Sequence, residues 1–197
     1  MNAAARRAQL IEVGRATFAE RGYEATTVEE IAARARISKP ILYHHFGGKE
    51  GLYAVVVDRE VEYILGEIAE AVSTGTPRER LEQAVLSYLT YVKERPEGFA
   101  LLLRDGAPHK RTGEMPALMH DLADRIGEVF TEQFREAGYD SKAAPIYAHA
   151  LVGMVAFVGP WWTESKKPLS VDVTASHISA LAWMGLRHLP KKPRLLE

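Results

Sequence analysis

Residues 27–46 read TVEEIAARARISKPILYHHF and contain the start signals of two short helices. Thr27 and Glu30 match a capping box: the Thr27 hydroxyl accepts from the Glu30 N–H, and the Glu30 side chain can reach back, so a helix follows to about residue 34. Ser38 is a favoured N-cap for the second helix, and Pro40 fits its first turn. Two short helices across a tight turn, packed on a preceding helix, form the helix-turn-helix pattern, which many all-α proteins share.

The second of these helices is predicted to have two different sides. At about 100° per residue, Leu42 and Phe46 share an apolar side with His45, which we interpret as a partly buried structural residue. The opposite side holds Lys39, Pro40, Tyr43 and His44, with Ile41 at the boundary. A cation, a phenol and an imidazole beside a helix N-terminus suit phosphate oxygens and groove edges, although a solvated face is the alternative. The adjacent histidines diverge by about 100°, so they cannot chelate one metal ion in a regular helix.

The composition is that of a folded protein of a reducing compartment. The chain has 197 residues, 47% of them hydrophobic and 26% charged, and no cysteine. Disulfides, thiol nucleophiles and cysteine zinc sites are therefore excluded. There is no uninterrupted run of 18 apolar residues, and charged residues interrupt the N-terminal stretch, so we expect neither a membrane span nor a signal peptide, and a cytoplasmic location. Residues 1–50 carry eight Lys and Arg against six Glu, a mild excess that permits a basic footprint there.

Apolar residues recur at helical spacing almost everywhere, which predicts an all-α fold of about nine helices and no strand. After the head, helices are expected at about 49–73, around 81–92, near 97–106, from 115 to about 137, at 143–162 and up to about 189. Residues 106–113 are expected to form a loop, and Pro160 to kink or end its helix. We therefore expect a DNA-binding head at 1–48 and a helical effector-binding and dimerisation body at 49–197.

The first fifty or so residues resemble the DNA-binding head of the tetracycline-repressor (TetR) family of bacterial regulators. The matching text is ATFAERGYEATTVEEIAARARISKPILYHHFGGKEGLYAVV, residues 16–56. The resemblance implies that Thr27 and Lys49 bond backbone phosphate. It implies that the major groove is met by Ser38, Lys39, Pro40, Tyr43 and His44, the last two often on phosphates. It also implies a helical C-terminal domain that binds small molecules and dimerises.

The chain departs from the usual family pattern at three positions of the head. Arg36 stands where the family often has a turn glycine, so the turn is either mildly strained or different. Pro40 replaces a small residue. Ile41 replaces a threonine and can contact a thymine methyl group but cannot donate a hydrogen bond. These differences bear on which operator sequence is recognised.

Residues 146–162, IYAHALVGMVAFVGPWW, are apolar nearly all round, which predicts burial on every side. One side can pack on its own domain, and we expect the other to pack on a second copy, together with the helix that ends near residue 189. The expected interface comprises Gly153, Phe157, Ile178, Leu181, Ala182, Gly185 and Leu186. Such a homodimer places two recognition helices about 34 Å apart and requires a palindromic operator. The alternative is a monomer in which the last helix covers this one.

An apolar cavity between the body helices is expected to take a lipophilic or aromatic effector. Its candidate residues, each of which can also be plain core, are Tyr88, Tyr91, Phe99, Leu103, Met119, Leu122, Ile126, Tyr147, Met154, Phe157, Trp161 and Trp162. His120 and Asp124 are four residues apart and can share a metal ion, but without further clustered ligands we interpret them as a solvated face. No metal or cofactor is expected.

These observations predict a dimeric, ligand-responsive transcriptional regulator, in the family's usual mode a repressor, whose effector moves the helix that starts at Lys49. The alternatives are a helical carrier or enzyme with a structural head, and a DNA-binding protein without an effector. No catalytic motif supports an enzyme. Residues 47–51, GGKEG, lack the spacing of a phosphate loop, and no G-x-S-x-G occurs.

Overall fold

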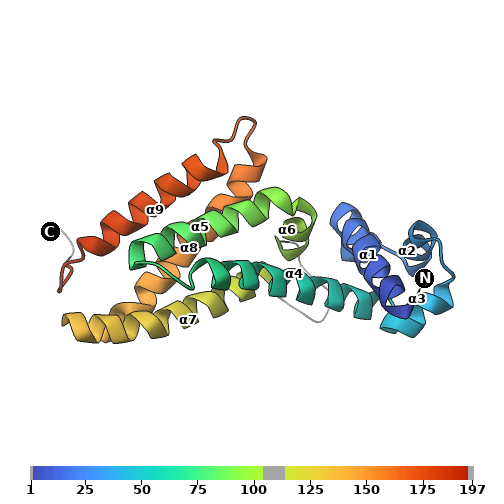
Figure 1. Ribbon diagram of the computed structural model, residues 1–197, viewed down its shortest axis with the longest axis horizontal. Helices are drawn as coiled ribbons and strands as arrows, with labels where there is room; N and C mark the ends of the chain where they lie inside the picture. Colours follow the sequence, from blue (N-terminus) through green and yellow to red (C-terminus); the bar gives the residue numbers. More distant parts are fainter. Residues whose placement is uncertain (1, 104–113, 195–197) are drawn as a thin grey trace. The chain divides into compact units, whose positions relative to one another are not determined.

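The computed structural model describes residues 2–103 and 114–194, and these stretches are helical with no strand, which confirms the all-α prediction (Figure 1). The expected loop at 106–113 lies outside the described residues. The elements are α1 (Ala3–Ala25), α2 (Val28–Ala35), α3 (Lys39–Phe46), α4 (Lys49–Ala71), α5 (Pro77–Glu94), α6 (Pro96–Leu103), α7 (Glu114–Ala137), the 3-10 helix η1 (Ser141–Ala143), α8 (Ala144–Glu164) and α9 (Val171–Arg187).

The chain folds into two compact units. The first comprises Met1–Gly66 and Arg95–Pro116, and the second comprises Glu67–Glu94 and Ala117–Glu197. The helix α4 therefore contributes to both. The first unit is larger than the expected head at 1–48, so that boundary remains a prediction about where the DNA-binding function ends.

The three head helices and the start of α4 share a core of fully buried apolar side chains, namely Leu10, Phe18, Ile31, Leu42 and, from α4, Leu52. At the start of α2 the Thr27 hydroxyl accepts from the Glu30 N–H at 3.2 Å, as the capping box predicts. The Glu30 carboxylate forms ion pairs with Arg21 at 2.8 Å and with Arg34 at 3.0 Å. The acidic residue at the start of α2 thus also fastens α2 to α1.

The turn between α2 and α3 closes on a left-handed residue. Arg36 has φ 54° and ψ 49°, the one positive φ outside glycine among the described residues. Its N–H bonds to the Ala33 carbonyl at 3.1 Å, and the Ile37 N–H bonds to the Ala32 carbonyl at 3.0 Å. These bonds satisfy carbonyls that the end of α2 would otherwise leave without partners, and they turn the chain into α3.

A buried carboxylate connects three helices of the first unit. Glu60 of α4 is only 2% exposed. Arg95, which precedes α6, donates two hydrogen bonds to it, from Nε at 3.0 Å and from Nη2 at 2.6 Å. The Arg15 Nε of α1 lies 3.9 Å from the same carboxylate, and Arg15 also pairs with Glu97 of α6 at 3.3 Å. A buried charge with such partners is compensated, and the network fixes α4 against α1 and α6.

In the second unit α9 packs along α5. There, a buried phenol compensates a proline in α8. Pro160 has no N–H to bond the Ala156 carbonyl, four residues earlier. The Tyr88 hydroxyl of α5 donates to that carbonyl at 3.0 Å, and burial raises the pKa of Tyr88, so it stays protonated. The helix continues beyond Pro160 to Glu164 instead of ending there.

The segment Ser141–Glu164, which joins η1 and α8, is long and apolar enough to cross a membrane by length and composition alone. The expectation of no membrane span rested on the absence of an uninterrupted apolar run, whereas this segment passes on average hydropathy because scattered polar residues do not offset its apolar content. The core helices of soluble proteins have the same composition. Only 22% of the residues in its most apolar stretch are buried within the single chain, so most of them are half-buried or exposed.

Candidate DNA-binding surface and effector cavity

The two predicted sides of α3 are present in the structure. Leu42 is fully buried, and Phe46 and His45 are half-buried. Lys39, Pro40, Tyr43 and His44 are exposed, and Ile41 is half-buried. Because α3 follows the tight turn and presents polar side chains outward, it has the placement of a recognition helix.

The N-cap residues of α2 and α3 are both accessible to a partner. Thr27 and Ser38 are both exposed N-cap residues. The Ser38 side chain makes no capping hydrogen bond, which leaves its hydroxyl available to a partner. The N-terminal N–H groups of a helix also attract anions, so both helix starts suit backbone phosphate.

Lys39, the lysine on the exposed side of α3, forms an ion pair with an acidic residue of α2. The Lys39 Nζ lies 2.7 Å from the Glu29 Oε1, and both side chains are exposed. This hydrogen bond holds the pKa of Glu29 below its ordinary value and the pKa of Lys39 above its ordinary value. Binding to a phosphate or a base edge therefore has to displace or share this pair.

Lys49 is engaged inside the first unit. Its Nζ donates to the Tyr23 carbonyl at 2.9 Å and lies 4.2 Å from the centroid of the Tyr23 ring. The half-buried side chain thus holds the start of α4 against the end of α1. The phosphate contact expected for Lys49 would compete with these two interactions, a feature that sequence alone gave no means to see.

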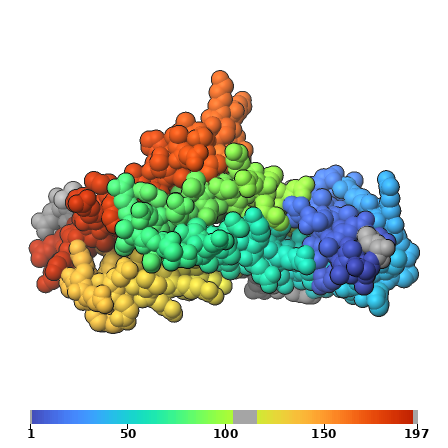
Figure 2. Space-filling view, viewed as in Figure 1, coloured from blue at the N-terminus to red at the C-terminus, as the bar shows by residue number. Residues whose placement is uncertain are grey.

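The second unit contains an apolar cavity of about 660 Å³. Its lining comes from the end of α4 and from α5, α7, α8 and α9, and includes Ile68, Val85, Tyr88, Leu122, Ile126, Val129, Phe130, Val152, Val155 and Trp183. In the space-filling view the surface is hollowed between the atoms of α7 (yellow) and those of α5 and α9 (green and red) (Figure 2). The volume falls within the range of sites for drug-sized ligands.

Four of the twelve residues expected at the effector site line this cavity: Tyr88, Met119, Leu122 and Ile126. The other eight lie elsewhere. Buried outside the lining are Tyr91, Phe99 and Trp162; half-buried are Tyr147 and Met154; exposed are Leu103, Phe157 and Trp161. The expectation favoured aromatic residues, whereas aliphatic residues supply much of the wall.

Sequence reasoning missed three cations at the cavity. Arg80 of α5, Arg125 of α7 and Arg187 of α9 belong to its lining, yet each is exposed, which places them at its rim. None forms an ion pair with any residue in the described part of the chain. They are far apart in sequence, so only the fold reveals that they share one cavity.

An apolar stripe remains uncovered on α8 and α9. Phe157 is 82% exposed, Trp161 62%, Leu181 67% and Met184 55%. The Cβ positions of Gly153 and Gly185 face open space. Of the other residues expected at an interface, Ile178 and Ala182 are buried within the subunit, and Leu186 lines the cavity. The interface prediction is thus narrowed to the exposed members.

An all-α chain with an outward-facing recognition helix and a helical unit around an apolar cavity has the architecture of a helix-turn-helix transcriptional regulator with room for a small molecule. Residues 10–56 match the family model of the bacterial regulatory proteins of the tetR family, and residues 67–194 match that of the tetracycline repressor-like C-terminal domain. The chain belongs to the TetR family of transcriptional regulators.

The similar proteins include both an activator and a repressor of transcription. The transcriptional activator FasR of Mycolicibacterium smegmatis is 28% identical over 188 residues, 94% of this chain and 84% of that protein. The transcriptional repressor KstR2 of the same organism is 32% identical over 190 residues, 93% and 91%. A TetR-like regulator from Rhodococcus sp. RHA1 superimposes with a TM-score of 0.74 at 27% identity, over 96% of this chain and all of that structure.

Proposed function

We propose that this protein is a homodimeric, non-catalytic, cytoplasmic transcriptional repressor. Its α3 helices bind a palindromic operator, and an amphipathic anion releases the protein from the DNA. The observation that carries the DNA part is the outward side of α3, which combines Lys39, Tyr43 and His44 with the free Ser38 hydroxyl. Pro40 and Ile41 lie beside them and supply apolar contacts to base edges. Thr27 at the start of α2 adds a phosphate contact.

The effector proposal rests on the chemistry of the cavity. Its apolar wall suits an acyl chain or a fused hydrocarbon skeleton, and burial of such a group supplies the main driving force. The rim arginines Arg80, Arg125 and Arg187 suit a carboxylate or phosphate group, because a guanidinium binds both with paired hydrogen bonds. An effector with an apolar body and an anionic head fits both observations better than a neutral lipophile.

The dimer proposal rests on the exposed stripe of Phe157, Trp161, Leu181 and Met184. Large apolar side chains exposed on two helices of one unit are costly to leave in water when they gather into a patch. A second copy of α8 and α9 about a two-fold axis covers it and completes a four-helix interface. The same symmetry pairs two α3 helices with two operator half-sites.

Two variants test the DNA surface in opposite directions. Lys39→Gln removes a cation and should weaken binding to all duplexes, lowering the salt slope by about one. Glu29→Gln should strengthen binding several-fold, because it frees Lys39 and removes a negative charge. Lys93→Gln, on the exposed side of α5, is the control and should change neither.

The measurement is titration of labelled duplex from the region upstream of its gene at several salt concentrations. No preference over random duplex would favour a carrier or enzyme with a structural head. The effector arm then adds palmitoyl-coenzyme A, palmitate or hexadecanol to the complex. Release by the anions, lost in Arg125→Ala, supports the proposal. Equal release by the alcohol contradicts the anionic head, and no release by any of many amphiphiles favours a regulator without an effector.

A further inference from the structure

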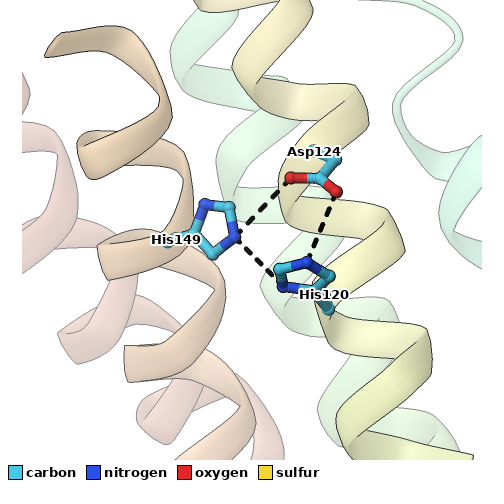
Figure 3. A group of neighbouring side chains, drawn as sticks. All are labelled: His120, Asp124 and His149. Carbon is cyan, nitrogen blue, oxygen red and sulfur yellow. Dashed lines mark hydrogen bonds and ion pairs between the residues drawn. The ribbon is translucent and has the colours of Figure 1, made fainter.

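Three side chains converge on the surface of the second unit, away from the apolar cavity lining. His120 and Asp124 come from successive turns of α7, and His149 comes from α8 (Figure 3). Their rings and carboxylate point toward one another across the gap between the two helices. One ligand atom from each lies within 4.8 Å of the others. The sequence pairs only the first two, since His149 is distant along the chain.

A hydrogen bond from the Nδ1 of His149 fixes the tautomer that leaves its Nε2 free to bind a metal ion. Its Nδ1 lies 2.9 Å from the Pro145 carbonyl, which can only accept, so Nδ1 carries the proton. The Nε2 lone pair then points into the cluster, where it lies 3.3 Å from the His120 Nδ1 and 3.6 Å from an Asp124 oxygen. A histidine held by a backbone carbonyl through its other nitrogen is the usual arrangement of a metal-binding imidazole.

These separations match a tetrahedral metal site. Zinc binds imidazole nitrogen and carboxylate oxygen at about 2.0–2.2 Å, so neighbouring ligand atoms of a tetrahedron lie about 3.3–3.6 Å apart. The two distances from the His149 Nε2 fall in that range. The remaining pair needs only a rotation of exposed side chains, which costs little.

The backbones that carry the ligands are held close together. A Cβ added to Gly127 of α7 would stand 3.5 Å from the Pro145 Cα and 3.7 Å from the Ala148 Cβ of α8. Ala123 and Ala144 are buried at or beside the same contact. Small residues therefore bring the helices together next to the three ligands, which reduces the ordering cost of binding an ion.

We propose that His120, Asp124 and His149 bind one Zn²⁺ ion per chain, with solvent in the fourth position. Two imidazoles and one carboxylate are a ligand set suited to zinc and to neighbouring divalent transition metals, and not to Mg²⁺ or Ca²⁺. The ion clamps α7 to α8. Met119 and Leu122 of α7 and Leu151 and Val152 of α8 line the cavity, so the ion would stiffen two of its walls.

The test uses the full chain without a histidine tag, stripped with a chelator and dialysed. Zn²⁺ is titrated against a chromophoric competitor, and Co²⁺ is added separately as a spectroscopic probe. We expect one Zn²⁺ per chain, intense visible bands of four-coordinate Co²⁺, and a rise in Tm of about 5–10 °C at a hundredfold excess over the Kd. Mg²⁺ should produce no shift.

Three variants and one control decide the assignment. His120→Ala, Asp124→Asn and His149→Ala should each weaken Zn²⁺ binding at least tenfold and abolish the Co²⁺ bands. His188→Ala is the matched control, because the His188 Nδ1 bonds a carbonyl four residues earlier, as His149 does, but on α9. It should bind Zn²⁺ as the unchanged protein does. Wild-type affinity in the three variants, loss in the control, or no stoichiometric binding at all would overturn the proposal.

Discussion

At the scale of single residues, several side chains have structural roles that their position in the sequence does not predict. Arg36 occupies a backbone conformation that glycine usually fills. Tyr88 replaces a hydrogen bond that Pro160 removes. Lys39 is paired with Glu29 on the very surface proposed to meet DNA. Tyr88 and Lys39 have partners on other helices, whereas Arg36 is held by bonds within its own turn.

The strain at Arg36 should be measurable as stability. A left-handed conformation costs a residue with a Cβ about 1–2 kcal/mol, partly offset by the greater chain entropy that glycine loses on folding. The free energy of unfolding of Arg36→Gly should therefore exceed that of Arg36→Ala by about 0.5–1 kcal/mol. Urea denaturation of the two variants checks this, and equal midpoints would mean that the turn tolerates a side chain without cost.

The bond between Tyr88 and the Ala156 carbonyl can be isolated by a double-mutant cycle. Tyr88→Phe leaves a buried carbonyl without its donor and should lower the free energy of unfolding by about 1–3 kcal/mol. Pro160→Ala restores an N–H four residues after Ala156. In that background the cost of Tyr88→Phe should shrink by at least about half a kcal/mol. An unchanged cost would show that the phenol stabilises the protein through packing alone.

How far sequence predicts a residue depends on where its partners come from. The sides of α3 follow from helical period, so the exposure of Tyr43 and the burial of Leu42 were predictable. Lys49 was expected at phosphate, but its partner Tyr23 is 26 residues away. Arg125 and His149 likewise acquire their roles from neighbouring helices. Charge pairing across helices has no periodic signature in the sequence.

At the scale of elements, the helices themselves were largely predictable, because capping residues and apolar stripes mark their ends. The end of α8 was the exception: a proline was expected to kink or end it, and a phenol from α5 compensates the lost hydrogen bond. Eight of the twelve expected effector residues lie outside the cavity lining for a related reason. Apolar stripes reveal which face of a helix is buried but not whether a cavity or a packed core lies beneath it.

The carboxylate that joins α1, α4 and α6 should dominate the stability of the first unit. Glu60→Ala leaves Arg95 without its bidentate partner and should lower the unfolding free energy by about 3–5 kcal/mol. Glu97→Ala removes a half-exposed partner of Arg15 and should cost at most about 1 kcal/mol. Thermal unfolding of the two variants provides the comparison. Similar losses would mean that the buried pair is no stronger than a surface one.

At the scale of the whole molecule, the stripe on α8 and α9 predicts a dimer that a single charge can break. Phe157→Glu places a carboxylate in the proposed interface and should shift the protein to monomers, with at least a hundredfold loss of operator affinity. Thr163→Glu is the matched control. It adds the same charge to the same helix, about 240° around from Phe157 and off the stripe.

Sedimentation equilibrium and duplex titration give the two readouts. If Phe157→Glu remains dimeric while Thr163→Glu dissociates, the interface lies on another face of α8. If both variants remain dimeric with full operator affinity, the exposed stripe is not the dimer interface. The sequence predicted that a second copy would cover residues 146–162, but the structure was needed to separate the exposed members of the stripe from Ile178 and Ala182.

The chain passes between the two compact units after Gly66, after Glu94 and after Pro116. This interleaving restricts how the protein can be recombined with its relatives. A chimera joined after residue 48 would take the Arg15 of one parent and the Glu60 and Arg95 of another, so it would inherit half of a buried ionic network. A functional exchange of heads should therefore carry residues 1–66 together with 95–116, two segments transplanted as one piece.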